Sequence, residues 1–264
     1  MSRNPAKDFG PIAADYKFFE DHATEGEQDA RAYLQQIVQF GPANGIVRFL
    51  DFGCGSGNFT SRLLTQAQWP PQRLRLTLVE PVVSARQQAA SRLADFVESP
   101  VTQFEELAAG LTASFEIIIA NHVFYYVPNL KDHLLRLIDA LAPAGIFLTA
   151  IAAKTNALIE FWTTGFELLG REIPYNTAED VEVALQELGA AYQKKQIAFV
   201  LTFPDTEENR MRIIRFLLGE YLPKIPLRPL LDLFDQHCRA GKIEIRTSSD
   251  HFTIRRGTPC IAGR

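Results

Sequence analysis

The sequence predicts an α/β fold in which seven strands form a doubly wound, mostly parallel sheet. From position 46 to position 151, continuous apolar runs alternate with segments whose apolar residues recur at helical spacing. This alternation is typical of a parallel sheet covered by helices on both faces. A turn that contains Gly53, Gly55 and Gly57 follows the first apolar run, as expected where a buried strand turns sharply into a helix.

We expect one domain, residues 1–264, built from three parts. Residues 1–45 are predicted to form an N-terminal helical lid, residues 46–153 a cofactor-binding core, and residues 154–264 the substrate-side helices and the last strands. The 264 residues, 47% of them hydrophobic, suffice for one sizeable core. Helices inserted before the last strand would lie over the carboxyl ends of the sheet, where open α/β sheets bind ligands. They are therefore a candidate substrate lid, with a purely structural cap as the alternative.

Composition excludes several classes of partner. A formal charge of −4 argues against nucleic-acid binding, which requires a basic patch. The three cysteines, Cys54, Cys238 and Cys260, have neither a disulfide framework nor a metal-ligand spacing, so we expect a reduced, cytoplasmic setting and no metal. Residues 1–7 lack the apolar stretch of a signal peptide, and the longest apolar run, 144–153, is too short to cross a bilayer. No membrane partner is expected.

Each element is predicted from its apolar spacing and its breakers. Two helices are expected within 13–40, broken around 22–26 and stopped by Gly41-Pro42. In the core the expected order is strand 46–50, helix 59–66, strand 74–79, helix 82–96, a weaker strand within 96–104, strand 115–120, helix 129–141 and strand 145–151. Beyond the core the expected order is helices 155–169 and 177–188, strand 197–203, helices 206–221 and 227–239, and strands 242–246 and 251–255.

The glycine turn distinguishes between two kinds of nucleotide cofactor. A dinucleotide fingerprint needs a third glycine or alanine, but counting from Gly53 or Gly55 the third position falls on Asn58 or Thr60. The three glycines, preceded by Asp51, instead resemble the first motif of class I S-adenosylmethionine (SAM) methyltransferases. That resemblance implies a Rossmann-like fold, SAM as cofactor and S-adenosylhomocysteine as product. It also implies that Asp51 and the three glycines, Gly53, Gly55 and Gly57, bind the cofactor.

Three further residues are predicted to contact SAM. Glu80 ends the second strand a little over twenty residues after the glycine turn, where an acid accepts hydrogen bonds from ribose hydroxyls. Gln103 falls where this fold usually places an adenine-contacting side chain, although many family members carry an acid there. Asn121 and His122 follow the fourth strand and should line the methionine end of the cofactor.

Beyond the superfamily, the chain resembles histamine N-methyltransferase. The resemblance rests on Phe-Glu-Asp-His-Ala-Thr-Glu at 19–25, Val-Glu-Pro at 79–81, Tyr-Tyr-Val at 125–127 and the ending 241–252. It implies that Glu25 holds the cationic amine of the acceptor and that Tyr16 and Phe19 form an aromatic pocket wall. His122 stands where that enzyme has a glutamine. The resemblance therefore predicts the fold of this chain better than it predicts the acceptor. We also place Tyr126 in the substrate pocket, since one of the two adjacent tyrosines is expected to be core.

The predicted activity is methyl transfer from SAM to a small-molecule acceptor, most simply an amine nitrogen. Catalysis would come from proximity and orientation, because the SAM sulfonium is already an activated electrophile. Glu25 and His122 are the candidate catalytic residues. Glu25 should position and select the amine, while the proton leaves to water or to a group such as His122. A hydroxyl or thiol acceptor stays open, as does a monomer or a dimer.

Other interpretations of the same residues remain. Glu25 could cap or pair on a helix surface, and His122 could be a packed histidine that donates to a backbone carbonyl. His22 is as suited to holding the N-terminal helices together as to touching a ligand, and Asp250 and His251 are expected to be structural or solvated. At the level of function, the alternatives are a methyltransferase acting on a protein or RNA and a catalytically silent protein that only binds SAM.

Overall fold

The computed structural model describes residues 10–42 and 44–256, so Cys260 and the first seven residues lie outside the described part. Its sheet has the strand order β3-β2-β1-β4-β5-β8-β6, with β7 paired to β8 beside this path. The strands are β1 Val47–Phe52, β2 Leu74–Val79, β3 Thr102–Phe104, β4 Phe115–Asn121, β5 Leu141–Ile151, β6 Ala191–Pro204, β7 Cys238–Arg239 and β8 Lys242–Arg255. The first five pair in parallel, and β8 is antiparallel to both β5 and β6. The prediction of a doubly wound, mostly parallel sheet is confirmed.

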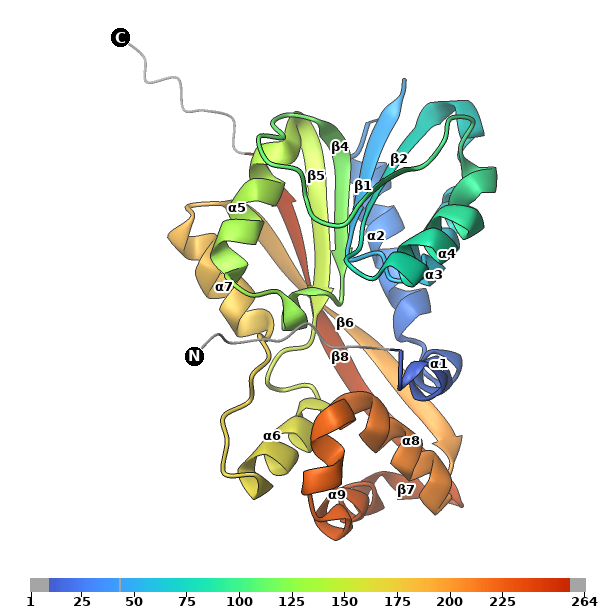
Figure 1. The fold of residues 1–264 in the computed structure, drawn as a ribbon, viewed down its shortest axis with the longest axis vertical. Coiled ribbons are helices and arrows are strands. Elements are labelled where there is room, and N and C mark those ends of the chain that lie inside the picture. Colours follow the sequence, from blue (N-terminus) through green and yellow to red (C-terminus); the bar gives the residue numbers. More distant parts are fainter. Residues whose placement is uncertain (1–9, 43, 257–264) are drawn as a thin grey trace.

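Helices cover both faces of the sheet (Figure 1). The α-helices are α1 Ala13–His22, α2 Glu25–Phe40, α3 Asn58–Ala67, α4 Val83–Leu93, α5 Leu130–Ala140, α6 Ile159–Leu168, α7 Ala178–Glu187, α8 Glu207–Leu218 and α9 Leu227–Asp232. The 3₁₀ turns are η1 Pro71–Arg73, η2 Ala94–Phe96, η3 Phe124–Tyr126, η4 Gly219–Lys224 and η5 Asp235–His237. Among the described residues, every helix is too short or too polar to traverse a lipid bilayer.

Alternation along the buried strands explains the two covered faces. Phe49 of β1 and Ile117 of β4 pack with α2, α3 and α4, whereas Leu50 and Ile118, one position on, pack with α5 and α7. Successive side chains of a strand point to opposite faces, so a run with no polar residue needs cover on both sides. The predicted core strands follow this pattern.

The last strands differ from the prediction in length. Positions 242–255 form one strand, not two, and β6 starts at Ala191 rather than at 197. The residues from 247 to 250 are polar and were not expected to belong to a strand, but their polar groups find partners within the continuous strand. The Asn156 side chain donates to the Ser248 carbonyl at 2.8 Å, and Lys194 of β6 pairs with Asp250 at 3.0 Å. The predicted helix 227–239 ends early, because α9 stops at Asp232 and is followed by η5 and β7.

The break between the first two helices lies at Ala23 and Thr24, and Gly26 belongs to α2. The backbone at this break joins strand β6. Ala23 forms a bridge with Leu201, and the Thr24 amide donates to the Val200 carbonyl at 2.9 Å. The Thr24 hydroxyl accepts the Val200 amide at 3.0 Å in return. The helix is therefore interrupted by pairing with a strand rather than by glycine.

A helical cap stands at one end of the sheet (Figure 1). Strands β6 and β8 extend beyond the parallel strands, and α6, α8 and α9 gather around this extension. Helix α1 packs on α8, where Asp15 and Arg215 form two hydrogen bonds of 3.0 and 3.1 Å. Helix α2 packs on α3 and on the sheet. The N-terminal segment thus joins the cap to the core, and its closing over an acceptor stays a prediction.

Candidate active site

A cavity of about 200 Å³ lies at the carboxyl ends of β1 and β4 and is also lined by residues of α1, α2, α6 and α8. Most of the predicted site residues line it: Tyr16, Phe19, Glu25, Asp51, Gly53, Gly55, Asn121, His122 and Tyr126. Three do not, namely Gly57, Glu80 and Gln103. The structure therefore gathers the residues predicted to contact the acceptor in one cavity, and three of the residues predicted to contact the cofactor lie outside its lining.

The glycine turn serves both packing and ligand access. Gly57 precedes α3 with φ +78°, and a Cβ there would lie 3.0 Å from the Cα of Ala89, so this glycine lets α3 and α4 approach. Gly55 also has a positive φ, +51°, but a Cβ there would meet no atom of the described residues within 4 Å. Its backbone faces the cavity, as is needed where a ligand lies against a turn at a helix N-terminus.

Two carboxyl groups brace the turn. Asp51 is buried and accepts a hydrogen bond from the Thr60 hydroxyl. Burial raises the pKa of Asp51 to about 7 despite this bond, and repulsion by Glu80 adds to the rise. The Glu80 carboxylate accepts the amide hydrogens of Gly55 and Val82, both at 3.0 Å. Glu80 is therefore built into the turn, and its contact with ribose stays a prediction.

Gln103 lies on the edge strand β3 with its side chain exposed, outside the cavity. The same edge carries exposed apolar side chains: Val82, Val83 and Phe104 are 44%, 53% and 38% exposed. The Phe104 carbonyl accepts the Glu80 amide at 3.1 Å, so this apolar surface adjoins the predicted ribose acid. A flat base could cover it, and the adenine contact of Gln103 stays a prediction.

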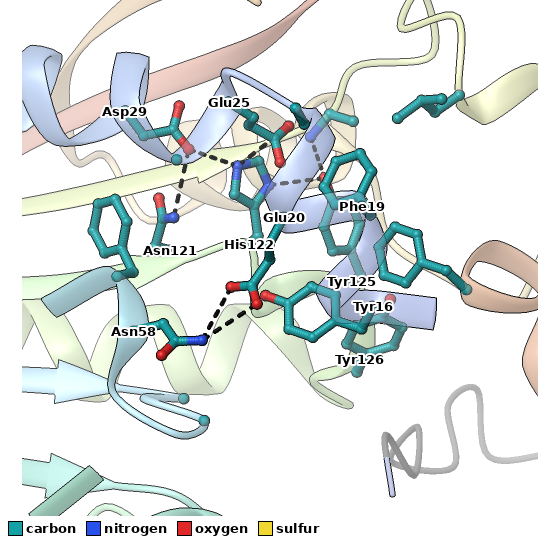
Figure 2. A pocket seen from close by; sticks show the side chains of 18 of the residues that line it. Tyr16, Phe19, Glu20, Glu25, Asp29, Asn58, Asn121, His122, Tyr125 and Tyr126 are labelled. Carbon is teal, nitrogen blue, oxygen red and sulfur yellow. Dashed lines mark hydrogen bonds and ion pairs between the residues drawn. The ribbon is translucent and has the colours of Figure 1, made fainter. Parts of the chain in front are cut away.

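His122 is the centre of a buried hydrogen-bond network (Figure 2). It follows β4 with a positive φ of +53°. Its Nε2 lies 2.9 Å from Oδ2 of Asp29 and 3.6 Å from Oε1 of Glu25, while its Nδ1 lies 3.1 Å from the Tyr125 hydroxyl. The second oxygen of Asp29 lies 2.8 Å from Nε2 of His251. The structure thus gives His122 a charged partner in place of the backbone carbonyl of the packed-histidine alternative.

Asp29 was missed by the sequence reasoning, although a signal exists. It follows Glu25 by four residues, which places both carboxylates on one face of α2. His251 was expected to be structural or solvated. It is buried, and the pairing of β8 with β5, together with the packing of α2 on the sheet, brings it to Asp29, 222 positions away.

Charges inside the network stabilise one another. Burial opposes the charge of His122, but Glu25 and Asp29 together raise its pKa to about 9. Burial raises the pKa of Glu25 to about 7, against the attraction of His122, and Asp29 adds a smaller repulsion. Burial also opposes the charge of Asp29, yet hydrogen bonds and attraction from His122 and then His251 lower its pKa. At neutral pH His122 is therefore an imidazolium beside the ionised Asp29, and Glu25 is ionised above about pH 7.

The same three groups are compact enough for a metal ion, since one ligand atom of each of Glu25, Asp29 and His122 lies within 4.8 Å of the others. A metal-bound histidine must be neutral at the liganding nitrogen, whereas the raised pKa of His122 favours its proton. The contact of His122 with Asp29 is a hydrogen bond of 2.9 Å and its contact with Glu25 is an ion pair of 3.6 Å, so we assign the cluster to a network of hydrogen bonds and ion pairs.

Aromatic rings lie beside the acids and form a further wall of the cavity (Figure 2). Tyr16 and Phe19 of α1 stack on Phe216 of α8, with ring centroids 5.3 and 4.8 Å apart. Tyr126 lines the cavity, and the Tyr125 hydroxyl accepts the Ala152 amide at 2.6 Å. Because Tyr16 and Phe19 come from α1 and Phe216 from α8, this wall belongs to the lid and the cap.

A second acid reaches the cavity from α1. Glu20 accepts a hydrogen bond from the Asn58 side chain at 3.2 Å, which links α1 to the start of α3 (Figure 2). Burial raises the pKa of Glu20. On the core side, the buried Oδ1 of Asn121 has no hydrogen-bond partner among the described residues. This acceptor, with the open backbone at Gly55 and the buried Asp51, fits a ligand that bears an amino group, as SAM does.

Comparison with known proteins identifies the family. Residues 21–195 match the family described as a methyltransferase domain. The chain belongs to the SAM-dependent methyltransferases. This methyltransferase is 33% identical over 249 residues to trans-aconitate 2-methyltransferase of Sinorhizobium medicae, covering 87% of this chain and 84% of that one. It is 28% identical over 225 residues to the enzyme of that name from Rhodopseudomonas palustris, covering 83% and 81%.

Solved structures support the fold. This methyltransferase superposes on the plantazolicin methyltransferase BpumL, solved with S-adenosylhomocysteine, with a TM-score of 0.53 at 12% identity, over 94% of this chain and 90% of that one. The class I assignment, the enzyme class and the SAM cofactor are thus confirmed. The finer resemblance to histamine N-methyltransferase is not shared by these curated relatives, whose names concern trans-aconitate.

Proposed function

We propose that this methyltransferase transfers the methyl group of SAM to a nitrogen of a small cationic amine. The observation that carries the proposal is the charge of the cavity wall. Glu20, Glu25 and Asp29 line the cavity on the acceptor side. Among the described lining residues the cationic groups are Arg62 and His122, and each faces a carboxylate, Arg62 at 3.3 Å from Glu27 and His122 at 2.9 Å from Asp29.

Such a wall suits an ammonium group on an apolar body. An ammonium beside an ionised carboxylate gains a charge-assisted hydrogen bond, worth about 1.5–3 kcal/mol. Aromatic faces add attraction for a cation of about 0.5–2 kcal/mol, and Tyr16 and Phe19 line the same cavity as Glu25. Because acids and aromatic rings surround the cavity on the acceptor side, we expect a small molecule rather than a protein or RNA acceptor.

The residues of this chain would bind and orient rather than activate. SAM, when bound, supplies a methyl group on a positively charged sulfur. Transfer would join that methyl carbon to the amine nitrogen and would leave the electron pair of the broken carbon–sulfur bond on sulfur. Only the free amine has a lone pair, so the ammonium held by Glu25 must first lose a proton. At neutral pH His122 already carries its proton and both its ring nitrogens have partners, so we propose that water takes the proton.

A second candidate is methylation of a carboxylate, which the names of the curated relatives favour. Trans-aconitate is a tricarboxylate, and placing like charges together at an interface costs several kcal/mol. In this cavity such an acceptor would meet Glu20 and Glu25, with Asp29 buried beside them, and no cationic group free of a carboxylate partner among the described lining residues. We therefore rank it below the amine.

The test is methyl transfer from SAM labelled on the methyl group. A panel should pair cationic amines, aliphatic and aromatic, with neutral amides of the same shape, and should include trans-aconitate. We expect label in one or more amines, with rates that rise with pH as the free amine becomes populated. Transfer to trans-aconitate alone would replace the proposal with the second candidate.

A further inference from the structure

Asp29 and His251 are buried behind His122, and the steps above use neither of them. The side chains of Asp29 and His251 are 1% and 8% exposed. Both oxygens of Asp29 are occupied, Oδ2 by His122 at 2.9 Å and Oδ1 by His251 at 2.8 Å. A carboxylate with both oxygens committed cannot also hold an acceptor. Any effect on the reaction must therefore pass through His122.

Burying such a group carries a cost. A buried carboxylate loses its hydration, and the loss is offset only when its oxygens find charged or hydrogen-bonding partners. Apolar residues of the same size are often no less stabilising in such places. An acid held between two histidines at the edge of a cavity therefore suggests a role beyond stability.

We propose that Asp29 and His251 are positioning residues that hold His122 as an imidazolium beside Glu25 and so keep Glu25 ionised for a cationic acceptor. The role in acceptor binding rests on the proposed function. The hydrogen bonds and ion pair that join Asp29, His251, His122 and Glu25 do not depend on it.

The geometry around His122 favours the charged ring. An imidazolium donates from both nitrogens, and both have acceptors within reach: Asp29 on the Nε2 side and the Tyr125 hydroxyl on the Nδ1 side. That hydroxyl already accepts the Ala152 amide at 2.6 Å and can accept from Nδ1–H as well. His122 carries its charge 3.6 Å from Glu25, whose Oε1 also accepts the Ser249 hydroxyl at 3.0 Å.

The elements packed against Glu25 and His122 contribute further titratable and polar groups that influence the protonation of these two side chains. Helix α2 brings Asp29, β8 brings Ser249 and His251, η3 brings Tyr125, and α1 brings Tyr16 and Glu20. Among the groups that act on Glu25, attraction by His122 is larger than repulsion by Asp29. A neutral His122 should therefore raise the pKa of Glu25 further, even when the charge of Asp29 is removed as well.

Asp29→Asn tests the proposal, because it keeps the shape and removes the charge. Without that charge the pKa of His122 should fall. A buried carboxyl at position 25 should then hold its proton to higher pH, so that fewer molecules bind an ammonium at pH 7. A rise of one unit in the Glu25 pKa, from about 7, would raise KM at pH 7 roughly fivefold. The turnover number at saturating amine should change much less.

The decisive readout needs no acceptor. Nitrogen-15 spectra of the histidine rings, with S-adenosylhomocysteine bound and His122 assigned through His122→Gln, report its protonation directly. We expect both ring nitrogens of His122 to stay protonated to pH 8 in the wild type and to lose a proton below pH 7 in Asp29→Asn. An unchanged His122 titration in this variant would overturn the proposal.

His251→Leu and His251→Gln carry the test if Asp29→Asn does not fold. Leucine removes the donor to Asp29 but leaves the charge of Asp29, so the carboxylate should hold the His122 proton to higher pH, opposite to the shift in Asp29→Asn, whereas glutamine retains a donor and should restore much of the wild-type titration. Thr253→Val is the matched control, since Thr253 is buried on the same strand but bonds Gln36 at 3.1 Å instead of Asp29. Equal shifts in all three variants would contradict a specific role. Expected spectra without methylation of any amine would leave the network standing and reject the proposed function.

Discussion

The two ends of the cavity are built in different ways. The cofactor end depends on one short stretch, 51–60, together with the strand beside it, where Glu80 accepts the Gly55 amide 25 positions away. The acceptor end joins segments that lie far apart: Glu25 meets Ser249 across 224 positions and Asp15 meets Arg215 across 200. Local sequence therefore constrains what is bound at the first end, and tertiary packing decides what is bound at the second.

The largest expected effect lies at the acceptor end, in Glu25→Gln. Truncating one partner of a buried charge pair commonly costs about 2–5 kcal/mol, so KM for a cationic amine should rise at least about thirtyfold. The turnover number should change far less, because the carboxylate binds the ground state and the transition state alike. Steady-state kinetics above pH 7 measure both quantities.

Glu187→Gln is the control for this variant. Glu187 lies on α7, outside the cavity, and pairs with Lys131 at 2.8 Å. Equal KM values in the two variants would mean that Glu25 does not contact the acceptor.

At the cofactor end, Glu80→Ala should weaken S-adenosylhomocysteine binding roughly 10- to 150-fold, because it removes charge-assisted hydrogen bonds of about 1.5–3 kcal/mol. The loss can have two causes. Glu80→Ala removes the predicted contact with ribose, and it also leaves the Gly55 and Val82 amides without their acceptor. Calorimetry on Glu80→Gln separates them, since the amide oxygen can still accept one backbone hydrogen. Wild-type affinity in Glu80→Ala would remove Glu80 from the cofactor site.

The difference between the two ends also explains what the sequence could predict. The strands of the core, the glycine turn and the family followed from apolar runs and from a motif within ten residues. Glu25, Tyr16 and Phe19 came from a resemblance, and the structure places them together in the cavity. Asp29 and His251 were missed as a pair, because Asp29 lies on α2 and His251 on β8, and the packing of α2 on the sheet that joins them has no local signature. The single strand β8 was missed because its polar residues find partners on Lys194 and Asn156.

Buried carboxyl groups at both ends of the cavity should make the free protein less stable as pH rises. A group with a raised pKa in the folded state stabilises the fold below its unfolded pKa and loses that contribution as pH rises through the folded value. Asp51 and Glu25 both titrate near 7 when folded, against ordinary values of 3.8 and 4.5. The melting temperature should therefore fall between pH 5 and pH 8.

Asp51→Asn and Glu25→Gln should each flatten this slope, which thermal unfolding at a series of pH values measures. A slope that neither variant alters would show that these carboxyls are not buried in the free protein.

The smallest expected effect concerns the lid. Residues 16–25 should gain protection from hydrogen exchange when cofactor and acceptor bind together, because lids come from the less stable parts of a fold. Thr24→Val, which removes the acceptor of the Val200 amide, should speed exchange at 23–24 and 200–201 by about fivefold, equivalent to about 1 kcal/mol. Full protection of 16–25 in the free protein would make this segment permanent core.

The preference between amine and carboxylate is tested most directly by one ratio, kcat/KM for the best cationic amine over kcat/KM for trans-aconitate, measured in wild type and in Glu25→Gln. We expect the wild-type ratio to lie well above one and to fall at least about thirtyfold in the variant, since only the amine loses an attraction of about 2 kcal/mol or more. A wild-type ratio below one, or a ratio that Glu25→Gln leaves unchanged, would contradict amine selection by Glu25.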